Sequence, residues 1–154
     1  ISNLMNRPPR SIRESIIERP QWQAIFAYGG IMSASVLAAF FISLEYLEAD
    51  YVDAVTVSFA TIALAQLWHV FNMRSPTSSI FVNEITGNRW VWMAILVCVG
   101  LLLGAIYFEP LANVLSVRPP SSSAWLRISC ASIPTLVVGQ LFTFVRRFFV
   151  QPKI

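Results

Sequence analysis

Charged side chains are scarce in this sequence. Lys, Arg, Asp and Glu together make up 12% of the 154 residues, and hydrophobic residues reach 56%. Soluble domains usually carry about 25% charged residues, and the mean hydropathy of +0.62 is correspondingly high. The composition therefore excludes an ordinary soluble domain and predicts an integral membrane protein.

The few charges leave four long apolar segments, at about residues 22–45, 54–72, 90–108 and 125–146. Each is near the ~20 residues that an α-helix needs to cross the hydrocarbon core of a bilayer. Because only helices and closed barrels satisfy the backbone in lipid, we predict an all-α membrane protein with four transmembrane helices.

Side chains that commonly carry chemistry are also few. The sequence has one His and two Cys, and both Cys lie inside apolar segments, where thiols mostly act as small hydrophobes. Apart from residues at the segment ends, such as Arg127, no charged residue lies in a predicted span. A small transporter acting alone needs an ionisable group inside the membrane, so the sequence argues against one.

The basic residues are distributed unevenly between the two sides of the predicted membrane domain. Nine of them precede the first span, flank the connection between the second and third spans, or follow the last span: Arg7, Arg10, Arg13, Arg19, Arg74, Arg89, Arg146, Arg147 and Lys153. Only Arg118 and Arg127 fall on the other side. By the positive-inside rule, both termini are expected to be cytoplasmic, so the net charge reflects topology, and we expect no nucleic-acid partner.

The second span carries a small and polar stripe. Ser58, Thr61, Ala65, His69 and Asn72 recur at steps of three and four, which places them on one helical face. An unpaired polar group in hydrocarbon costs several kcal/mol, so this face is expected to contact protein or water. A more apolar face carries Val57, Ala60, Leu64, Leu67 and Phe71.

Other spans carry features that are typical of helix packing. Gly30, Ala34 and Ala38 form a small-xxx-small ridge in the first span, although small residues are also frequent in membrane helices generally. Pro134 should kink the last span, and Gln140 is expected to hydrogen-bond to another helix. The third span has almost no polar atoms, so we expect it to be the helix most exposed to lipid.

We expect three regions along the chain. Residues 1–21 form a cytoplasmic loop with a short amphipathic helix, because Ser11 and Glu14 have the spacing of a capping box. This loop could anchor the chain on anionic lipid or dock a cytoplasmic domain. Residues 22–147 form the four-helix domain, and residues 148–154 form a cytoplasmic tail. Since the chain starts at Ile1 rather than Met, we expect it to be part of a longer protein.

Several motifs, in order, resemble type II P-type cation-transporting ATPases of the calcium-pump and sodium-pump group. Leu4-Met5-Asn6-Arg7-Pro8-Pro9-Arg10 resembles the Ile-Met-Asp-Arg-Pro-Pro-Arg stretch after the sixth membrane helix of those pumps, and residues 66–74 resemble the eighth-helix sequence Gln-Leu-Phe-Asn-Glu-Ile-Asn-x-Arg of the plasma-membrane calcium pump. Further matches are Gly29-Gly30, Pro110-Leu111, Trp125-Leu126 and Pro134.

The resemblance implies that the chain is the loop before helix seven and helices seven to ten of such a pump. It aligns Gln66 with a helix-eight position that contributes to the ion sites, where the reticulum calcium pump has Glu, and it places His69 beside it. Gln66 is thus the candidate metal ligand, and its neutral amide implies either that one of two calcium sites is lost or that another cation is carried. Docking to the phosphorylation domain is implied for Arg7, Pro8, Pro9, Arg10 and Arg13, and helix packing for Gly30, Ala34, Ala38, Pro134 and Gln140.

The phosphorylated Asp-Lys-Thr-Gly-Thr sequence of the family is missing from this chain. The resemblance therefore implies that ATP and Mg²⁺ bind other domains of the parent pump, and that this chain alone does not hydrolyse ATP and holds no cofactor. Its expected partners are helices one to six, the lipid bilayer and the transported cation, in a plasma or bacterial inner membrane rather than an organelle. The alternative is a separately expressed, non-catalytic scaffold or accessory subunit that derives from such a domain.

Overall fold

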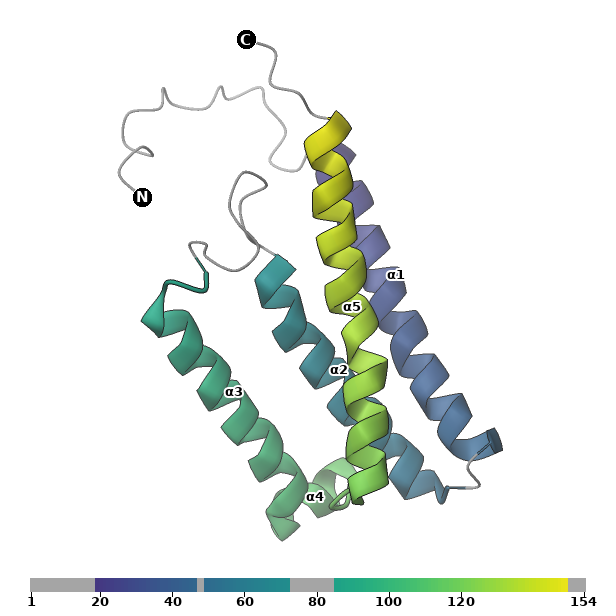
Figure 1. The fold of residues 1–154 in the computed structure, drawn as a ribbon. Coiled ribbons are helices and arrows are strands. Elements are labelled where there is room, and N and C mark those ends of the chain that lie inside the picture. The colour runs from purple at the N-terminus through teal and green to yellow at the C-terminus, as the bar shows by residue number, and fades with distance from the viewer. Residues whose placement is uncertain (1–18, 47–48, 73–84, 150–154) are drawn as a thin grey trace.

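The computed structural model describes residues 19–46, 49–72 and 85–149, and this part of the chain is helical (Figure 1). Four helices are long and apolar enough to cross a membrane: α1 (Arg19–Phe41), α2 (Tyr51–Asn72), α3 (Arg89–Tyr107) and α5 (Ser122–Phe149). The prediction of an all-α protein with four transmembrane helices is thereby confirmed.

The ends of α3 show how local sequence sets a helix boundary. The side chain of Asn88 accepts a hydrogen bond of 3.0 Å from the backbone N–H of Trp90, so Asn88 acts as an N-cap. At the other end, Phe108 leaves the helical conformation, and its N–H donates to the carbonyl of Gly104 at 2.9 Å. The helix thus starts and stops within a residue of the predicted span.

Two further elements were not predicted. A π-helical turn, Ile42–Tyr46, continues α1, and a short helix, α4 (Glu109–Leu115), follows α3. Pro110 lies in the first turn of α4, where its missing N–H has no intrahelical partner to lose. Pro110, just after the predicted third span, thus stands at the start of a new helix whose C-cap, Ser116, has a φ of 53°.

Helix α2 is the centre of the bundle and contacts α1, α3 and α5. A core of small and branched apolar residues joins the four long helices, and its buried members are Ala39, Val57, Ala60, Leu102, Ile106, Ala124 and Ile128. Small residues at helix contacts let membrane helices approach closely, which increases their van der Waals contact. The stripe residues Thr61, Ala65 and Asn72 are buried, and so are Val57 and Ala60 of the more apolar face.

The expectation that the third span is the most exposed helix does not hold within this chain. Helix α3 buries Leu102, Ala105 and Ile106, whereas Ala39 is the one buried residue among the described side chains of α1. Composition reports how apolar a helix is but not which neighbours it has. Most of the surface of α1 is thus left uncovered by the rest of the described chain.

The start of α1 and the end of α5 lie at one end of the bundle, and α4 lies at the other (Figure 1). The cytoplasmic location of both termini and the boundaries of the three predicted regions stay predictions. The proposed docking residues Arg7, Pro8, Pro9, Arg10 and Arg13 lie outside the described residues.

Candidate functional site

Gln66 lies on a face of α2 that the described chain leaves open. Its side chain is exposed, whereas the adjacent Ala65 is fully buried. Ile62, one turn earlier, is also exposed, at 40%. Gln66 precedes Asn72 by six residues, or about 9 Å along the helix axis, so it is well within the span. A primary amide at this depth is unfavourable against lipid, which makes this face a candidate contact for protein or water.

His69 lies one turn after Gln66 on α2 and is half-buried. Its ring packs against the ring of Tyr28 on α1, with 4.5 Å between the centroids. The Nδ1 atom of His69 is buried and has no hydrogen-bond partner among the described residues. The hydroxyl of Tyr28 donates to the carbonyl of Gly139 at 3.4 Å. Tyr28 therefore connects α1 with both α2 and α5.

A hydrogen-bonded amide pair joins α2 to α5 at the end of α2. The Nδ2 atom of Asn72 donates to the carbonyl of Thr135 at 2.9 Å. The Nε2 atom of Gln140 donates to Oδ1 of Asn72 at 3.1 Å and lies 3.4 Å from the carbonyl of Phe71. Asn72 is 6% exposed, so its bonds satisfy an amide that would otherwise be costly to bury.

Gly139 is the residue that allows this pair to form. A Cβ atom built at Gly139 would overlap the Nδ2 and Cγ atoms of the Asn72 side chain and would lie 2.6 Å from its Oδ1. The absence of a side chain at position 139 thus decides how closely α5 approaches α2.

A second polar link lies near Pro134, the proline inside α5. The indole Nε1 of Trp68 donates to Oγ of Ser132 at 3.0 Å, and that hydroxyl donates to the carbonyl of Ser129 at 2.9 Å. A proline inside a helix disturbs the hydrogen bonds of the preceding turn, and the Ser132 hydroxyl gives one carbonyl of that turn a partner. Pro134 itself is exposed.

The small residues of α1 are not covered by the described chain. Gly30, Ala34 and Ala38 are all exposed, and a Cβ atom at Gly30 would meet nothing within 4 Å. Ala34 and Ala38 line an open groove between α1 and α5. The ridge that we predicted to support close packing is thus free to receive a neighbour.

An ion-pair cluster at the opposite end of the bundle was missed by the sequence analysis. The guanidinium of Arg118 lies 2.6 Å from Asp53 and 3.3 Å from Asp50, and the carboxylate of Asp53 raises the pKa of Arg118 above its ordinary value. The backbone N–H of Arg118 donates to Oγ1 of the buried Thr56 at 3.0 Å. The sequence did contain a signal for this cluster, because acidic residues before the second span and a basic residue before the last span were predicted to lie at the same membrane surface.

The described residues do not make a complete metal site. Within them, no three His, Cys, Asp or Glu side chains lie close enough together to hold a metal ion. Gln66 offers one carbonyl oxygen, whereas Ca²⁺ takes six to eight oxygen ligands. An ion that contacts Gln66 therefore needs most of its ligands from elsewhere.

Comparison with known proteins identifies the family of this chain. The family profile described as "Cation transporting ATPase, C-terminus" matches residues 2–145. The chain belongs to this family. The four membrane-spanning helices thus belong to a C-terminal region of a cation-transporting ATPase.

Individual relatives agree with this family. The chain is 32% identical to "Calcium-transporting ATPase" of Bacillus subtilis over 143 residues, which cover 92% of the chain and 16% of the relative. It is 31% identical to "Calcium-transporting ATPase 1" of Bacillus cereus over 90 residues, 58% of the chain and 10% of the relative. An endoplasmic reticulum-type "Calcium-transporting ATPase 3" of Arabidopsis thaliana is 26% identical over 86 residues, 56% of the chain and 9% of the relative. The chain thus spans about a sixth or less of the length of these relatives.

Proposed function

We propose that this chain is the membrane support domain of an ATP-driven cation pump, and that it contributes Gln66 to the ion path. The observation that carries the proposal is the exposure of Gln66 on a membrane-spanning helix of a chain that belongs to the cation-transporting ATPase family. The polar stripe residues Thr61 and Asn72 are buried, whereas the side chain of Gln66 is exposed and can face helices outside this chain.

The proposed support role rests on two open surfaces. One is the face of α2 with Ile62 and Gln66, and the other is the uncovered surface of α1 around Gly30. Both would receive helices of the parent pump. The links from α2 to α5 through Asn72 and Trp68 would hold α2 in place while the other helices move during the transport cycle.

Calcium is the cation that we propose as cargo, because the relatives in two Bacillus species carry that ion in their names. ATP and Mg²⁺ would bind domains of the parent protein outside this chain. The contribution of this chain to the reaction would be to position one amide oxygen for the cation and to brace the helices that supply its other ligands.

The test uses the full-length pump that carries this domain, reconstituted in sealed vesicles. We expect Gln66→Ala to lower ATP-dependent ⁴⁵Ca²⁺ uptake at least tenfold or to raise the calcium concentration for half-maximal uptake by a similar factor. Loss of one charge-dipole ligand worth about 1.5–3 kcal/mol has this effect. Gln66→Glu should retain binding, because it keeps the oxygen and adds a charge.

The matched control is Ile62→Ala, which shortens an exposed side chain on the same face of α2 without removing an oxygen ligand. It should leave the calcium dependence unchanged. Normal uptake and normal calcium dependence in Gln66→Ala would contradict the ion-path role and would favour a non-catalytic scaffold.

A further inference from the structure

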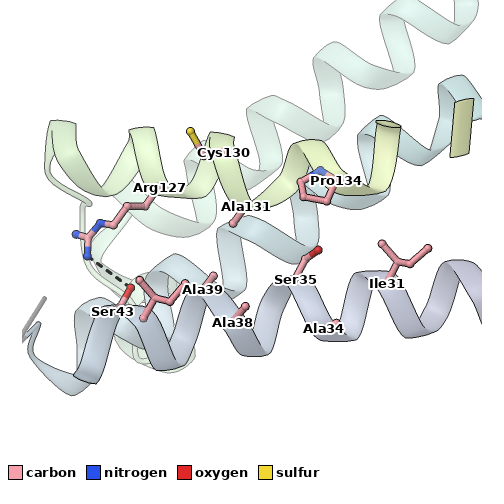
Figure 2. Close-up of a pocket in the computed structure, with 11 residues that line it drawn as sticks. Ile31, Ala34, Ser35, Ala38, Ala39, Ser43, Arg127, Cys130, Ala131 and Pro134 are labelled. Atoms are coloured by element: carbon pink, nitrogen blue, oxygen red, sulfur yellow. Dashed lines mark hydrogen bonds between the residues drawn. The ribbon is translucent and has the colours of Figure 1, made fainter. Parts of the chain in front are cut away.

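An open groove of about 600 Å³ runs between α1 and α5. Figure 2 shows that Ala34, Ser35 and Ala38 of α1 line one side of it and that Ala131 and Pro134 of α5 line the other. Its volume is within the ~300–1,000 Å³ range of small-molecule sites. The wall is largely apolar, because most of it is formed by alanine and isoleucine side chains and by the ring of Pro134.

One end of the groove carries a positive charge. Arg127 extends from α5 toward Ser43 of the π-helical turn, and its Nη1 lies 3.5 Å from the Ser43 hydroxyl (Figure 2). Its Nε donates to the carbonyl of Ser123 at 3.3 Å. These two long bonds use two of the five N–H groups of a guanidinium.

Arg127 forms no salt bridge within the described residues, although its charge acts on Asp53 at longer range. The nearby carboxylates Asp50 and Asp53 form their ion pairs with Arg118, and no carboxylate of the described chain lies within salt-bridge distance of Arg127. A charged side chain inside a membrane span extends to the headgroup region. Five residues separate Arg127 from the start of α5 at Ser122, or about 7.5 Å, so its guanidinium lies near the membrane surface.

We propose that the groove binds one anionic phospholipid, with an acyl chain against Ala34, Ala38 and Pro134 and the phosphate on Arg127. The inference rests on the match between an apolar channel with one cationic end and a ligand with an apolar chain and one anionic end. It concerns a surface separate from Gln66 and does not depend on the proposed ion path.

A transmembrane helix is the other candidate occupant, and the charge distribution argues against it. A helix that filled the groove would pair with Arg127 only if it carried an accepting side chain at that depth. A phospholipid satisfies the guanidinium at that depth without any such requirement, since every anionic lipid carries its phosphate at the headgroup level.

The test uses the full-length protein in nanodiscs that contain phosphatidylcholine and phosphatidylglycerol. A phosphatidylglycerol with a photoreactive group in its acyl chain is cross-linked, and the modified peptides are identified by mass spectrometry. We expect adducts on α1 and α5 near Ala38 and Ala131, with less labelling by the corresponding phosphatidylcholine. Millimolar inorganic phosphate should not compete, because the acyl chain supplies most of the binding.

Two variants and one control make the result decisive. Arg127→Gln should reduce groove labelling about fivefold, as expected for the loss of one basic contact with an anionic lipid, and Arg127→Lys should retain most of it. Arg89→Gln removes an exposed basic residue at the start of α3 and should change nothing. Unchanged labelling in Arg127→Gln, equal labelling by both lipids, or no adducts near Ala38 and Ala131 would overturn the proposal.

Discussion

Two amide side chains on α2 have opposite environments, although both lie within the same span. Asn72 is 6% exposed and is bonded to Thr135 and Gln140, whereas Gln66 is exposed. An amide that is buried with partners stabilises the contact between helices, and an amide without them in hydrocarbon costs free energy. The environment of each residue, rather than its type, therefore separates a packing role from a candidate ligand role.

Gly139→Ala is expected to destabilise the membrane domain by about 1–3 kcal/mol, because the added methyl group overlaps the Asn72 side chain in a packed contact. The free energy of unfolding can be measured on the full-length protein by titration with SDS in mixed micelles. Gly100→Ala is the matched control, since a Cβ atom at Gly100 meets nothing within 4 Å. An equal effect of the two substitutions would contradict the packing argument.

At the scale of elements, a hydrogen bond joins α2 and α5 close to Pro134, the proline inside α5. Pro134 removes a backbone donor from α5, and Ser132 gives the carbonyl of Ser129 a hydrogen-bond partner while accepting from Trp68. The same hydroxyl thus links α5 to α2 just before Pro134.

Ser132→Ala is expected to cost about 0.6 kcal/mol, and at most about 1.7 kcal/mol, which is the range measured for hydrogen bonds between membrane helices. Trp68→Phe should cost a similar amount, and the double variant should cost less than the sum, because both changes remove the same bond. Ser129→Ala serves as the control, since it removes an exposed hydroxyl and leaves the backbone carbonyl in place. Strict additivity of Trp68→Phe and Ser132→Ala would show that the bond makes no contribution.

At the scale of the whole molecule, the bundle is covered unevenly. Helix α2 is surrounded by α1, α3 and α5, whereas α1 leaves Gly30 exposed and α2 leaves Gln66 exposed. A chain that spans 16% of its relative from Bacillus subtilis is expected to have such open surfaces if other helices of the parent protein adjoin it. We propose three environments for the open surfaces of this chain. Helices of the parent protein adjoin the surfaces around Gln66 and Gly30, and a lipid fills the groove at Arg127.

The expected orientation of the bundle can be tested by labelling with an impermeant maleimide in intact cells. In a variant with Cys98 and Cys130 replaced by Ala, Asn113→Cys in α4 should react from outside, because the positive-inside rule places α4 on the non-cytoplasmic side. Gly87→Cys, at the other end of α3, should react only after the membrane is made permeable. The reverse pattern would show that the termini are not cytoplasmic.

The sequence by itself determined the number and approximate bounds of the spans and the family. Spans can be predicted because the free energy of transferring a helix into lipid is a sum over contiguous residues. That sum does not depend on which other helices lie beside it. The family was readable from short motifs such as the one at Arg7-Pro8-Pro9-Arg10.

Only the tertiary structure decided which polar groups are paired and which are open. Four features depend on residues that are 60 or more positions apart, or on the rotation of one helix against another. They are the direction in which Gln66 faces, the fit of Asn72 over Gly139, the pairing of Arg118 with Asp53 and the groove at Arg127. Helical periodicity states which residues share a face but not what covers that face.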